Sequence, residues 1–305
     1  MYKDIDYSLY NGVPKKYRLI RNKEFKDWEI PPWDLVIDPD RLIGKGEYGK
    51  VYLASWRETE VVAKVMGDTI DKKTKQLFIN EFDALSKAHH PNVVQLLGYI
   101  EDPFIIVMEY LPCNNLLYYI INNHLDLMGK IKICMDILKG IEYLHSRKPQ
   151  SIIHRDIKPQ NIILTETKKA KIGDFGLSKF FSSNEIKKSI STETLETIDT
   201  NINSIEMTNP IGTKRYMSPE IIRKETYDHK IDIWSLGIMF SELFENKRYD
   251  KDFFWFKTPI NIQNIISQYM LRNEPNDRLS ALELIQQFQY IQLQISNKKH
   301  TCFCS

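Results

Sequence analysis

A chain of 305 residues, 42% of them hydrophobic, can bury a sizeable core, so we expect a folded globular protein of one large or two modest domains. Lysine and arginine number 42 against 40 aspartate and glutamate, a net charge of +2. This balance indicates neither nucleic acid nor an acidic membrane surface as a partner. The four cysteines lack C-x-x-C spacing, and no apolar window approaches the roughly 20 residues of a membrane span. We therefore expect a protein of a reducing compartment, the cytoplasm, without a membrane span or a secretory leader.

The first part of the chain has the character of a sheet. Residues 1–34 are polar and aromatic without a clear period, and we expect them to be an extension that leads into the domain. From Leu35 to Met66, short β-branched runs alternate with glycines, which predicts antiparallel strands. Helical spacing of apolar residues predicts one helix over Lys73–Ala88, and strand character returns at Val93–Leu97 and Phe104–Met108.

The remainder of the chain is mainly helical. Apolar residues at helical spacing are clearest in Ile131–His145, Ile231–Phe244, Ile262–Leu271 and Ala281–Phe288. Residues 181–209 are crowded with serine, threonine, glutamate and asparagine, and such a segment cannot bury enough surface to offset its ordering entropy. We expect a mobile loop there.

A glycine-rich motif, Gly44-x-Gly46-x-x-Gly49-x-Val51, lies between two of the expected strands. Glycines permit a tight turn and let backbone N–H groups approach phosphate oxygens. Such a motif is often no more than a turn, and a dinucleotide-binding fold would need a helix directly after it. Because Lys50–Trp56 has strand character, the pattern favours a flap that covers phosphates.

Lys64 ends the apolar run of Val61, Val62 and Ala63, where an unpaired ammonium would be costly to bury. Glu81, in the next helical segment, is its natural partner if that helix packs on the sheet. The alternative is an edge lysine whose ammonium group reaches water.

The segment His154–Asn161 contains His-Arg-Asp-Ile-Lys-Pro-Gln-Asn and is followed by Asp174-Phe175-Gly176. These motifs come downstream of the glycine loop and Lys64, and in that order they resemble the eukaryotic protein kinase family. Further matching segments are Gly212-Thr213, Tyr216–Glu220, Asp232–Gly237 and Arg278.

The resemblance implies an α+β fold of two lobes with ATP in the cleft between them. It implies a protein kinase domain over 35–290, after an N-terminal extension of 1–34 and before a C-terminal tail of 291–305. The small antiparallel-sheet lobe with one helix would cover 35–117 and the larger helical lobe 118–290, with an activation segment over 174–220. In the family, Glu220 pairs with the arginine at Arg278, and Asp232 braces the catalytic loop.

The resemblance also implies catalytic roles. Asp156 would accept the proton of the substrate hydroxyl, and Lys158 would neutralise the γ-phosphate. Asn161 and Asp174 offer the hard oxygen ligands that suit Mg²⁺, for which Mn²⁺ can substitute. Lys64, held by Glu81, would bind the α- and β-phosphates. ATP binding is further assigned to the glycines Gly44, Gly46 and Gly49, the apolar residues Ile43, Val51, Val62 and Ile163, the gatekeeper Met108 and the hinge residues Glu109 and Leu111.

The type of acceptor hydroxyl follows from a few positions. Lys158 and Gly212-Thr213 resemble serine/threonine kinases, whereas Trp28–Pro31 and Asp174–Lys179 resemble the tyrosine-kinase-like group, whose members mostly phosphorylate serine and threonine. We therefore expect serine/threonine specificity, with dual or tyrosine specificity as the alternative. With these group features and a composition rich in asparagine, isoleucine and lysine, the chain resembles kinases of amoebal protists or of their giant viruses. A viral kinase would act in the host cytoplasm.

Two other functions remain alternatives. A pseudokinase scaffold would keep the fold without the chemistry, but such proteins typically lack one of the acting residues, and here every one is present. A small-molecule kinase is disfavoured by Thr213–Glu220, which in the family forms the platform for a peptide acceptor. We expect a protein substrate, whose identity the sequence leaves open together with the upstream activator and the oligomeric state.

The chain departs from the family at four places. Val62 stands where alanine is usual, which adds two methyl groups to the expected adenine pocket. The segment Asp232–Arg278 is shorter than usual, so the family's mode of substrate docking cannot be carried over to this chain. The activation segment is long and carries the hydroxyls of Ser189, Ser191, Thr192, Thr194, Thr197 and Thr200. These residues either belong to a disordered tether or are sites of autophosphorylation. In the second case, a phosphate on the segment would bind Arg155. The residues Cys302–Ser305 fit a loose prenylation pattern at Cys302, or form a frayed tail.

Overall fold

The computed structural model describes residues 27–46, 49–66, 72–122, 125–182, 214–250 and 253–301. The chain divides into two compact units. Unit 1 ends at His89 and resumes for Val94–Tyr110, and unit 2 comprises His90–Val93 and the chain from Leu111 onward. The hydroxyls of the activation segment, Gly212-Thr213 and Cys302 lie outside the described residues.

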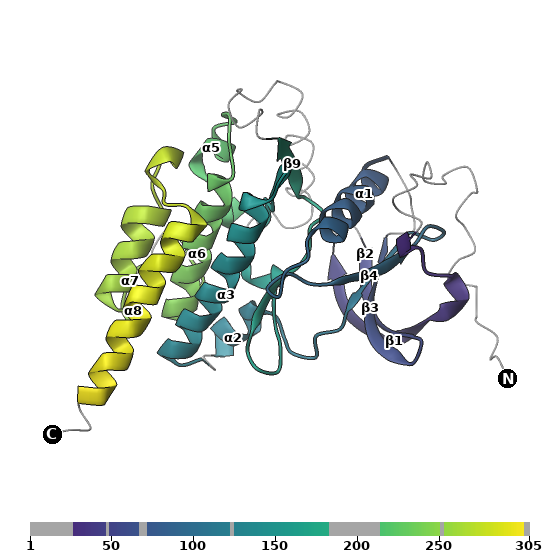
Figure 1. Ribbon diagram of the computed structural model, residues 1–305, viewed down its shortest axis with the longest axis horizontal. Helices are drawn as coiled ribbons and strands as arrows, with labels where there is room; N and C mark the ends of the chain where they lie inside the picture. The colour runs from purple at the N-terminus through teal and green to yellow at the C-terminus, as the bar shows by residue number, and fades with distance from the viewer. Residues whose placement is uncertain are drawn as a thin grey trace. The chain divides into compact units, whose positions relative to one another are not determined.

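Unit 1 is built on one antiparallel sheet with a single long helix (Figure 1). Its elements are β1 (Leu35–Gly46), β2 (Gly49–Trp56), β3 (Thr59–Met66), α1 (Lys72–Lys87), β4 (Leu96–Ile100) and β5 (Ile105–Glu109), and the strand order is β1-β2-β3-β5-β4. The hairpin between β2 and β3 closes through Arg57 and Glu58, whose φ angles of 49° and 67° match the right-handed twist of paired strands. The expected strand-rich segment with one helix is therefore present.

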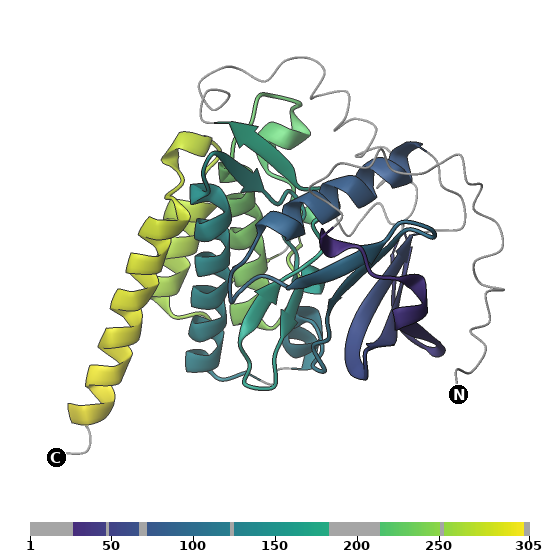
Figure 2. The same ribbon diagram turned by 45° about the vertical axis from the view of Figure 1, so that its right-hand side comes forward.

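The two faces of this sheet have different neighbours. Val61 and Ala63 of β3 are fully buried in a core with Leu35, Ala54 and Val107. Because side chains alternate along a strand, Val62 and Lys64 lie on the opposite face. α1 packs beside β4, where the ring of Phe82 lies 4.8 Å from that of Tyr99, as Figures 1 and 2 show for the helix.

The residues just before β1 pack onto the sheet rather than only leading into it. The Ile30 N–H donates to the carbonyl of Tyr99 at 2.8 Å, and the Ile30 side chain is buried. It lies so close to Gly98 that a β-carbon there would come within 2.6 Å of it. Trp28 stacks on His89 with ring centroids 6.1 Å apart. A single buried isoleucine creates no period, so the sequence pattern carried no sign of this contact.

Unit 2 is mainly helical, with α3 packed against both α6 and α8 (Figures 1 and 2). Its helices are α2 (Leu116–Asn122), α3 (Leu127–Ser146), α5 (Pro219–Ile222), α6 (Lys230–Glu245), α7 (Ile260–Ile265) and α8 (Ala281–Thr301). The helix expected over Ile262–Leu271 changes to a π-helical turn at Ile266–Met270. α8 continues well beyond the expected end at Phe288, because Ile291 prolongs its buried stripe. In the described part of the chain, no helix is long and apolar enough to cross a membrane.

Two short pairs of strands position the loops of unit 2. β6 (Gln150–Ile153) pairs with β9 (Lys179–Ser182), and β7 (Ile162–Leu164) pairs with β8 (Ala170–Ile172). The loop 154–161 leads from β6 into β7, and the loop 173–178 leads from β8 into β9. Since β7 and β8 are paired, the end of the first loop lies beside the start of the second, and Gly173 N–H donates to the Asn161 carbonyl at 2.9 Å.

The docking of Ile30 on the sheet can be tested by stability. Ile30→Ala should lower the free energy of unfolding by about 2–4 kcal/mol, because it removes a buried side chain and leaves a cavity. The matched control Val36→Ala shortens a side chain that is 57% exposed and should cost less than about 0.5 kcal/mol. Urea titrations compare the two variants, and equal stabilities would contradict the docking.

Candidate active site

In unit 1, a buried ion pair joins the sheet to the helix. Lys64 on β3 donates to both carboxylate oxygens of Glu81 on α1, at 2.9 and 2.6 Å. The side chain of Glu81 is 1% exposed and that of Lys64 is 14% exposed. A pair so poorly hydrated holds both charges only while α1 stays against the sheet. The structure thus places Glu81 opposite the lysine that sequence analysis paired with it.

Other candidate residues share the sheet face of Lys64. Val51 lies directly opposite Lys64 in the pairing of β2 with β3, and Met108 lies opposite Val62 in the pairing of β3 with β5. Val62 also stands two residues from Lys64, so all four side chains project from the same face. This face therefore presents one cation among apolar side chains.

The glycine loop has a steric requirement of its own. A β-carbon on Gly49 would come within 2.3 Å of the Val65 carbonyl oxygen, so the approach of β2 to β3 excludes any side chain there. Gly44 pairs with Val51 across β1 and β2, and Ile43 beside it is 48% exposed. Gly49 therefore serves the hairpin as well as any phosphate contact.

The remaining candidates lie near the end of unit 1 and in unit 2. The Glu109 carboxylate accepts the Gln95 N–H at 2.7 Å, so this side chain supports the end of β5. Leu111 is the first residue of the long part of unit 2. Ile163 lies half-buried on β7, bridged to Asn115.

In unit 2, two polar side chains of the loop 154–161 converge on the carboxylate of a third, Asp156. The Asp156 Oδ2 atom accepts the Lys158 ammonium at 2.7 Å and the Asn161 amide at 2.9 Å. The Asn161 amide also donates to the Asp156 carbonyl at 2.8 Å. Among the described residues, nothing donates to the second carboxylate oxygen, Oδ1. Asp156 is thus held by one oxygen and can accept a proton or a hydrogen bond on the other.

The environment of Asp156 makes it a better proton acceptor than an ordinary aspartate. Burial raises its pKa, and the charge of Asp174 raises it further, whereas Lys158 opposes both effects. Asp174 is an exposed residue with a left-handed φ of 60°, a conformation that non-glycine residues seldom adopt. The next residue, Phe175, is fully buried against the His154 ring. This turn separates the phenylalanine from the carboxylate.

A buried aspartate on α6 holds the backbone of this loop. Asp232 accepts the N–H groups of His154 and Arg155, each at 2.9 Å, and the His145 ring nitrogen, also at 2.9 Å. Burial alone would raise the pKa of Asp232, but the hydrogen bond from His145 and the proximity of His154 hold it below the ordinary value. Asp232 therefore remains ionised and keeps its hydrogen bonds.

The Arg155 side chain is already engaged. Its Nη1 donates to the Tyr227 hydroxyl at 3.1 Å, and its Nε donates to the Leu177 carbonyl. Tyr227 is buried with Phe181 of β9 and Ile231 of α6. These contacts use two of the five N–H groups of the guanidinium, so a phosphate on the activation segment would meet an arginine whose position is already fixed.

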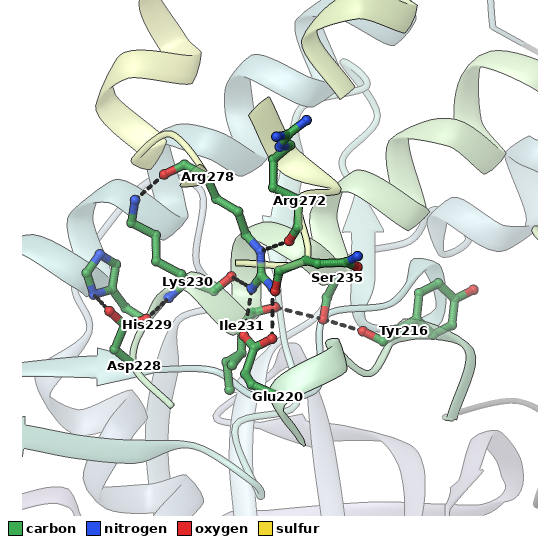
Figure 3. Close-up of polar contacts among 10 residues, drawn as sticks. Tyr216, Glu220, Asp228, His229, Lys230, Ile231, Ser235, Arg272 and Arg278 are labelled. Carbon is green, nitrogen blue, oxygen red and sulfur yellow. Dashed lines mark hydrogen bonds and ion pairs between the residues drawn. The ribbon is translucent and has the colours of Figure 1, made fainter. Parts of the chain in front are cut away.

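The segment after residue 213 is anchored to α6 and to Arg278 (Figure 3). Arg278 forms a two-point ion pair with Glu220, at 2.6 and 2.8 Å, and both side chains are buried. Its remaining donors reach the carbonyls of Arg272, Lys230 and Asn273. Ser235 donates to the Tyr216 carbonyl at 2.8 Å, which ties the start of this segment to α6 (Figure 3).

Three further residues that contact the candidate site residues were not among the sequence-based predictions. His145, Tyr227 and Ser235 contact Asp232, Arg155 and Tyr216, respectively. The first two contacts join residues 87 and 72 positions apart. Neither spacing nor residue type marks such pairs in a single sequence.

His229 lies beside the brace formed by His145 and Asp232. Its ring centroid is 5.0 Å from that of His145, and its Nδ1 is 4.0 Å from the Asp228 carboxylate (Figure 3). Burial, then the charge of His145, lower the pKa of His229 to about 4, while Asp228 opposes the shift. Protonation of His229 would therefore introduce a poorly hydrated charge next to the brace.

The side-chain oxygens of Asn161 and Asp174 suit a magnesium ion that takes its other ligands from phosphates and water. The Asn161 amide nitrogen is used by Asp156, so its oxygen is directed elsewhere and accepts no hydrogen bond within the described chain. No group of three or more His, Cys, Asp or Glu side chains suited to a metal occurs in that part of the chain. Mg²⁺ typically takes one or two protein oxygens and keeps waters and phosphates as its other ligands. Asn161 and Asp174 fit that pattern.

Comparison with known proteins identifies the family. The protein kinase domain model matches residues 37–291, so the chain belongs to the protein kinase domain family. It is 34% identical over 228 residues to the serine/threonine-protein kinase VIK of Arabidopsis thaliana, covering 72% of this chain and 48% of that protein. It is 37% identical over 242 residues to the putative serine/threonine-protein kinase/receptor R826 of Acanthamoeba polyphaga mimivirus, covering 78% and 13%, respectively. The chain thus spans less than half of either relative. The match and the described architecture confirm the expected α+β kinase fold.

The ion pair between Arg278 and Glu220 gives a prediction about stability. Arg278→Met should cost about 3–5 kcal/mol of unfolding free energy, because it leaves the Glu220 carboxylate buried and unpaired. The double variant Glu220→Leu/Arg278→Met should be more stable than Arg278→Met, since no lone charge remains. The control Arg272→Met alters a side chain that is 49% exposed and should cost less than about 0.5 kcal/mol. Urea titration measures all three, and a double variant no more stable than the single would contradict this account.

The low pKa of His229 gives a prediction about pH. An unfolded histidine takes up a proton near pH 6.5 and the folded His229 only near pH 4. Between these values the unfolded state binds more protons, so acidification should destabilise the fold by at most about 1.4 kcal/mol per pH unit. His229→Gln should reduce that slope. Unfolding free energies of both proteins from pH 7 to 4.5 are the measurement, and identical slopes would show that His229 is not responsible.

Proposed function

We propose that this chain is a serine/threonine protein kinase that transfers the γ-phosphate of ATP to protein hydroxyls. The geometry around Asp156 carries the proposal: one carboxylate oxygen is held by Lys158 and Asn161, and the other is left to accept a hydrogen bond. A general base needs such an orientation and a pKa raised toward the working pH. The pseudokinase alternative would leave this arrangement without a use.

Each residue of the loop has a role in the proposed reaction. Asp156 orients the acceptor hydroxyl and takes its proton as the oxygen bonds to the γ-phosphorus and the bond to the β-phosphate oxygen breaks. Lys158 supplies positive charge to the transferred group. Asn161 and Asp174 would hold Mg²⁺, or Mn²⁺ in its place, and the ion neutralises phosphate charge when bound.

Unit 1 supplies residues suited to binding the nucleotide. The Lys64 ammonium, fixed by Glu81, is proposed to bind the α- and β-phosphates. Val51, Val62 and Met108 project from the same sheet face and are proposed to contact the adenine. An outward swing of α1 would separate Glu81 from Lys64 and lower activity.

Serine/threonine specificity rests on Lys158 and on the names of the relatives, which are described as serine/threonine kinases. Dual or tyrosine specificity is the second candidate, because a shared kinase fold does not by itself specify the surface that recognises the acceptor residue. We further propose autophosphorylation of the serines and threonines between 189 and 200 and action in the cytoplasm. The hydroxyl-rich composition and the absence of paired cysteine motifs support these two proposals.

The central test is transfer of labelled γ-phosphate from Mg·ATP to the chain and to a generic protein acceptor. Wild type should label serine and threonine, and Asp156→Asn should lose at least about a hundredfold in rate, because the neutral amide cannot take the proton. Phosphoamino acid analysis identifies the hydroxyl.

Asp277→Asn is the matched control, since this exposed carboxylate lies outside the loop and its loss should leave transfer unchanged. Labelling of tyrosine would favour the second candidate. ATP binding without transfer by wild type, even after treatment with an activating kinase, would support the pseudokinase alternative.

A further inference from the structure

A second buried carboxylate on α6 contacts Tyr216, near the start of residues 214–220. We call these residues the platform, because the matching segment of the family supports the peptide acceptor. The Glu242 side chain is fully buried, and its Oε2 accepts the Tyr216 hydroxyl at 2.7 Å. Its Oε1 accepts the Tyr249 N–H at 2.9 Å. Burial and the Glu242 charge raise the pKa of Tyr216 far above its usual value, so this hydroxyl stays a neutral donor.

Two arginines share this one carboxylate. Arg215 Nη1 lies 3.4 Å and Arg248 Nε 3.3 Å from Glu242 Oε1. One guanidinium would suffice to neutralise Glu242, so the cluster carries an excess positive charge. The arginine side chains are 19% and 30% exposed, and each uses a single nitrogen in these contacts. Their other N–H groups find no hydrogen-bond acceptor in the described residues, so they can bind an anion from outside.

Helix α6 connects the two arginines to the loop that carries Asp156. α6 holds the catalytic loop through Asp232 and the platform through Ser235 and Glu242, all within unit 2. Asp232 and Glu242 are separated by about 15 Å of helix at 1.5 Å per residue. An extended peptide covers that length in about four to five residues.

We propose that Arg215 and Arg248 bind an acidic side chain of the protein substrate, located some four to five residues from the acceptor hydroxyl. The ligand is a carboxylate or a phosphoryl group, both of which match the planar fork of N–H donors on a guanidinium. Lys214, exposed beside Arg215, adds to the positive potential. The inference rests on the proposed function and names the substrate class of that kinase: acidic or previously phosphorylated sequences.

The first experiment uses wild-type protein and a series of serine peptides. Glutamate, phosphoserine, alanine or lysine is placed in turn at each position up to about six residues on either side of the acceptor. At one position near four or five residues away, glutamate or phosphoserine should raise kcat/KM about tenfold over alanine, and lysine should lower it. Preference for phosphoserine alone would identify a phosphoryl ligand, and equal preference a general acidic one. No acidic preference at any position, or a basic one, would overturn the proposal.

The second experiment assigns the preference to residues. Arg215→Gln and Arg248→Gln should each reduce the acidic preference mainly through KM, whereas the exposed Arg223→Gln should preserve it. Thermal unfolding shows whether each variant is folded. If Arg215→Gln fails to fold, Arg215→Lys replaces it; this variant keeps the charge but loses the planar fork of donors, so it should retain only part of the acidic preference. Folded glutamine variants with the full wild-type preference would overturn the assignment.

Direct binding separates this inference from the proposed function. The peptides are made with alanine in place of the acceptor serine, and their affinity is measured by fluorescence anisotropy. An acidic preference in binding without any phosphate transfer would refute the kinase activity and leave the arginine site standing. Transfer without any charge preference would refute the arginine site alone, and absence of both binding and transfer would refute both.

Discussion

The backbone of the loop 154–161, which we propose to be catalytic, depends on the buried carboxylate of Asp232. It accepts the amide hydrogens of His154 and Arg155, and Arg155 has a left-handed φ of 68°. That conformation costs free energy for a residue with a side chain, and the two hydrogen bonds to Asp232 fix the backbone that leads into it. Since Arg155 directly precedes Asp156, the same two hydrogen bonds help to position the backbone that carries the Asp156 carboxylate.

Helix α6 repeats this arrangement along its length, because three of its acids are buried and each fixes a different segment. Asp232 holds the loop 154–161, Glu242 holds Tyr216, and Glu245 accepts backbone N–H groups of Phe256, Lys257 and Thr258. A buried charge is costly unless fully hydrogen-bonded, so each segment has few alternative positions. The donors on Glu242 differ from the others, because two of them are cations that remain partly exposed.

Local features of the sequence were enough for much of the site. The glycine loop, Lys64 and the order of motifs from His154 to Gly176 indicated a kinase, and the helical spacing around Glu81 indicated its partner. Those features lie within short segments, where residue type and spacing are informative. The docking of Ile30 and the length of α8 could not be predicted, because one buried side chain or a sparse apolar stripe creates no pattern.

The sequence by itself determined the kinds of chemical group present and their order, which suffices for family, fold class and the candidates Asp156, Lys158 and Asn161. Only the tertiary structure decided which oxygen of Asp156 is occupied, that Arg155 is held by Tyr227, and that Arg215 and Arg248 meet over Glu242. The physical reason is range. Propensity and periodicity describe the backbone over a few residues, whereas Arg155 and Tyr227 are 72 positions apart. The hydrogen bonds of one carboxylate and the charge balance of a buried cluster depend on side-chain geometry that exists only once the chain has folded.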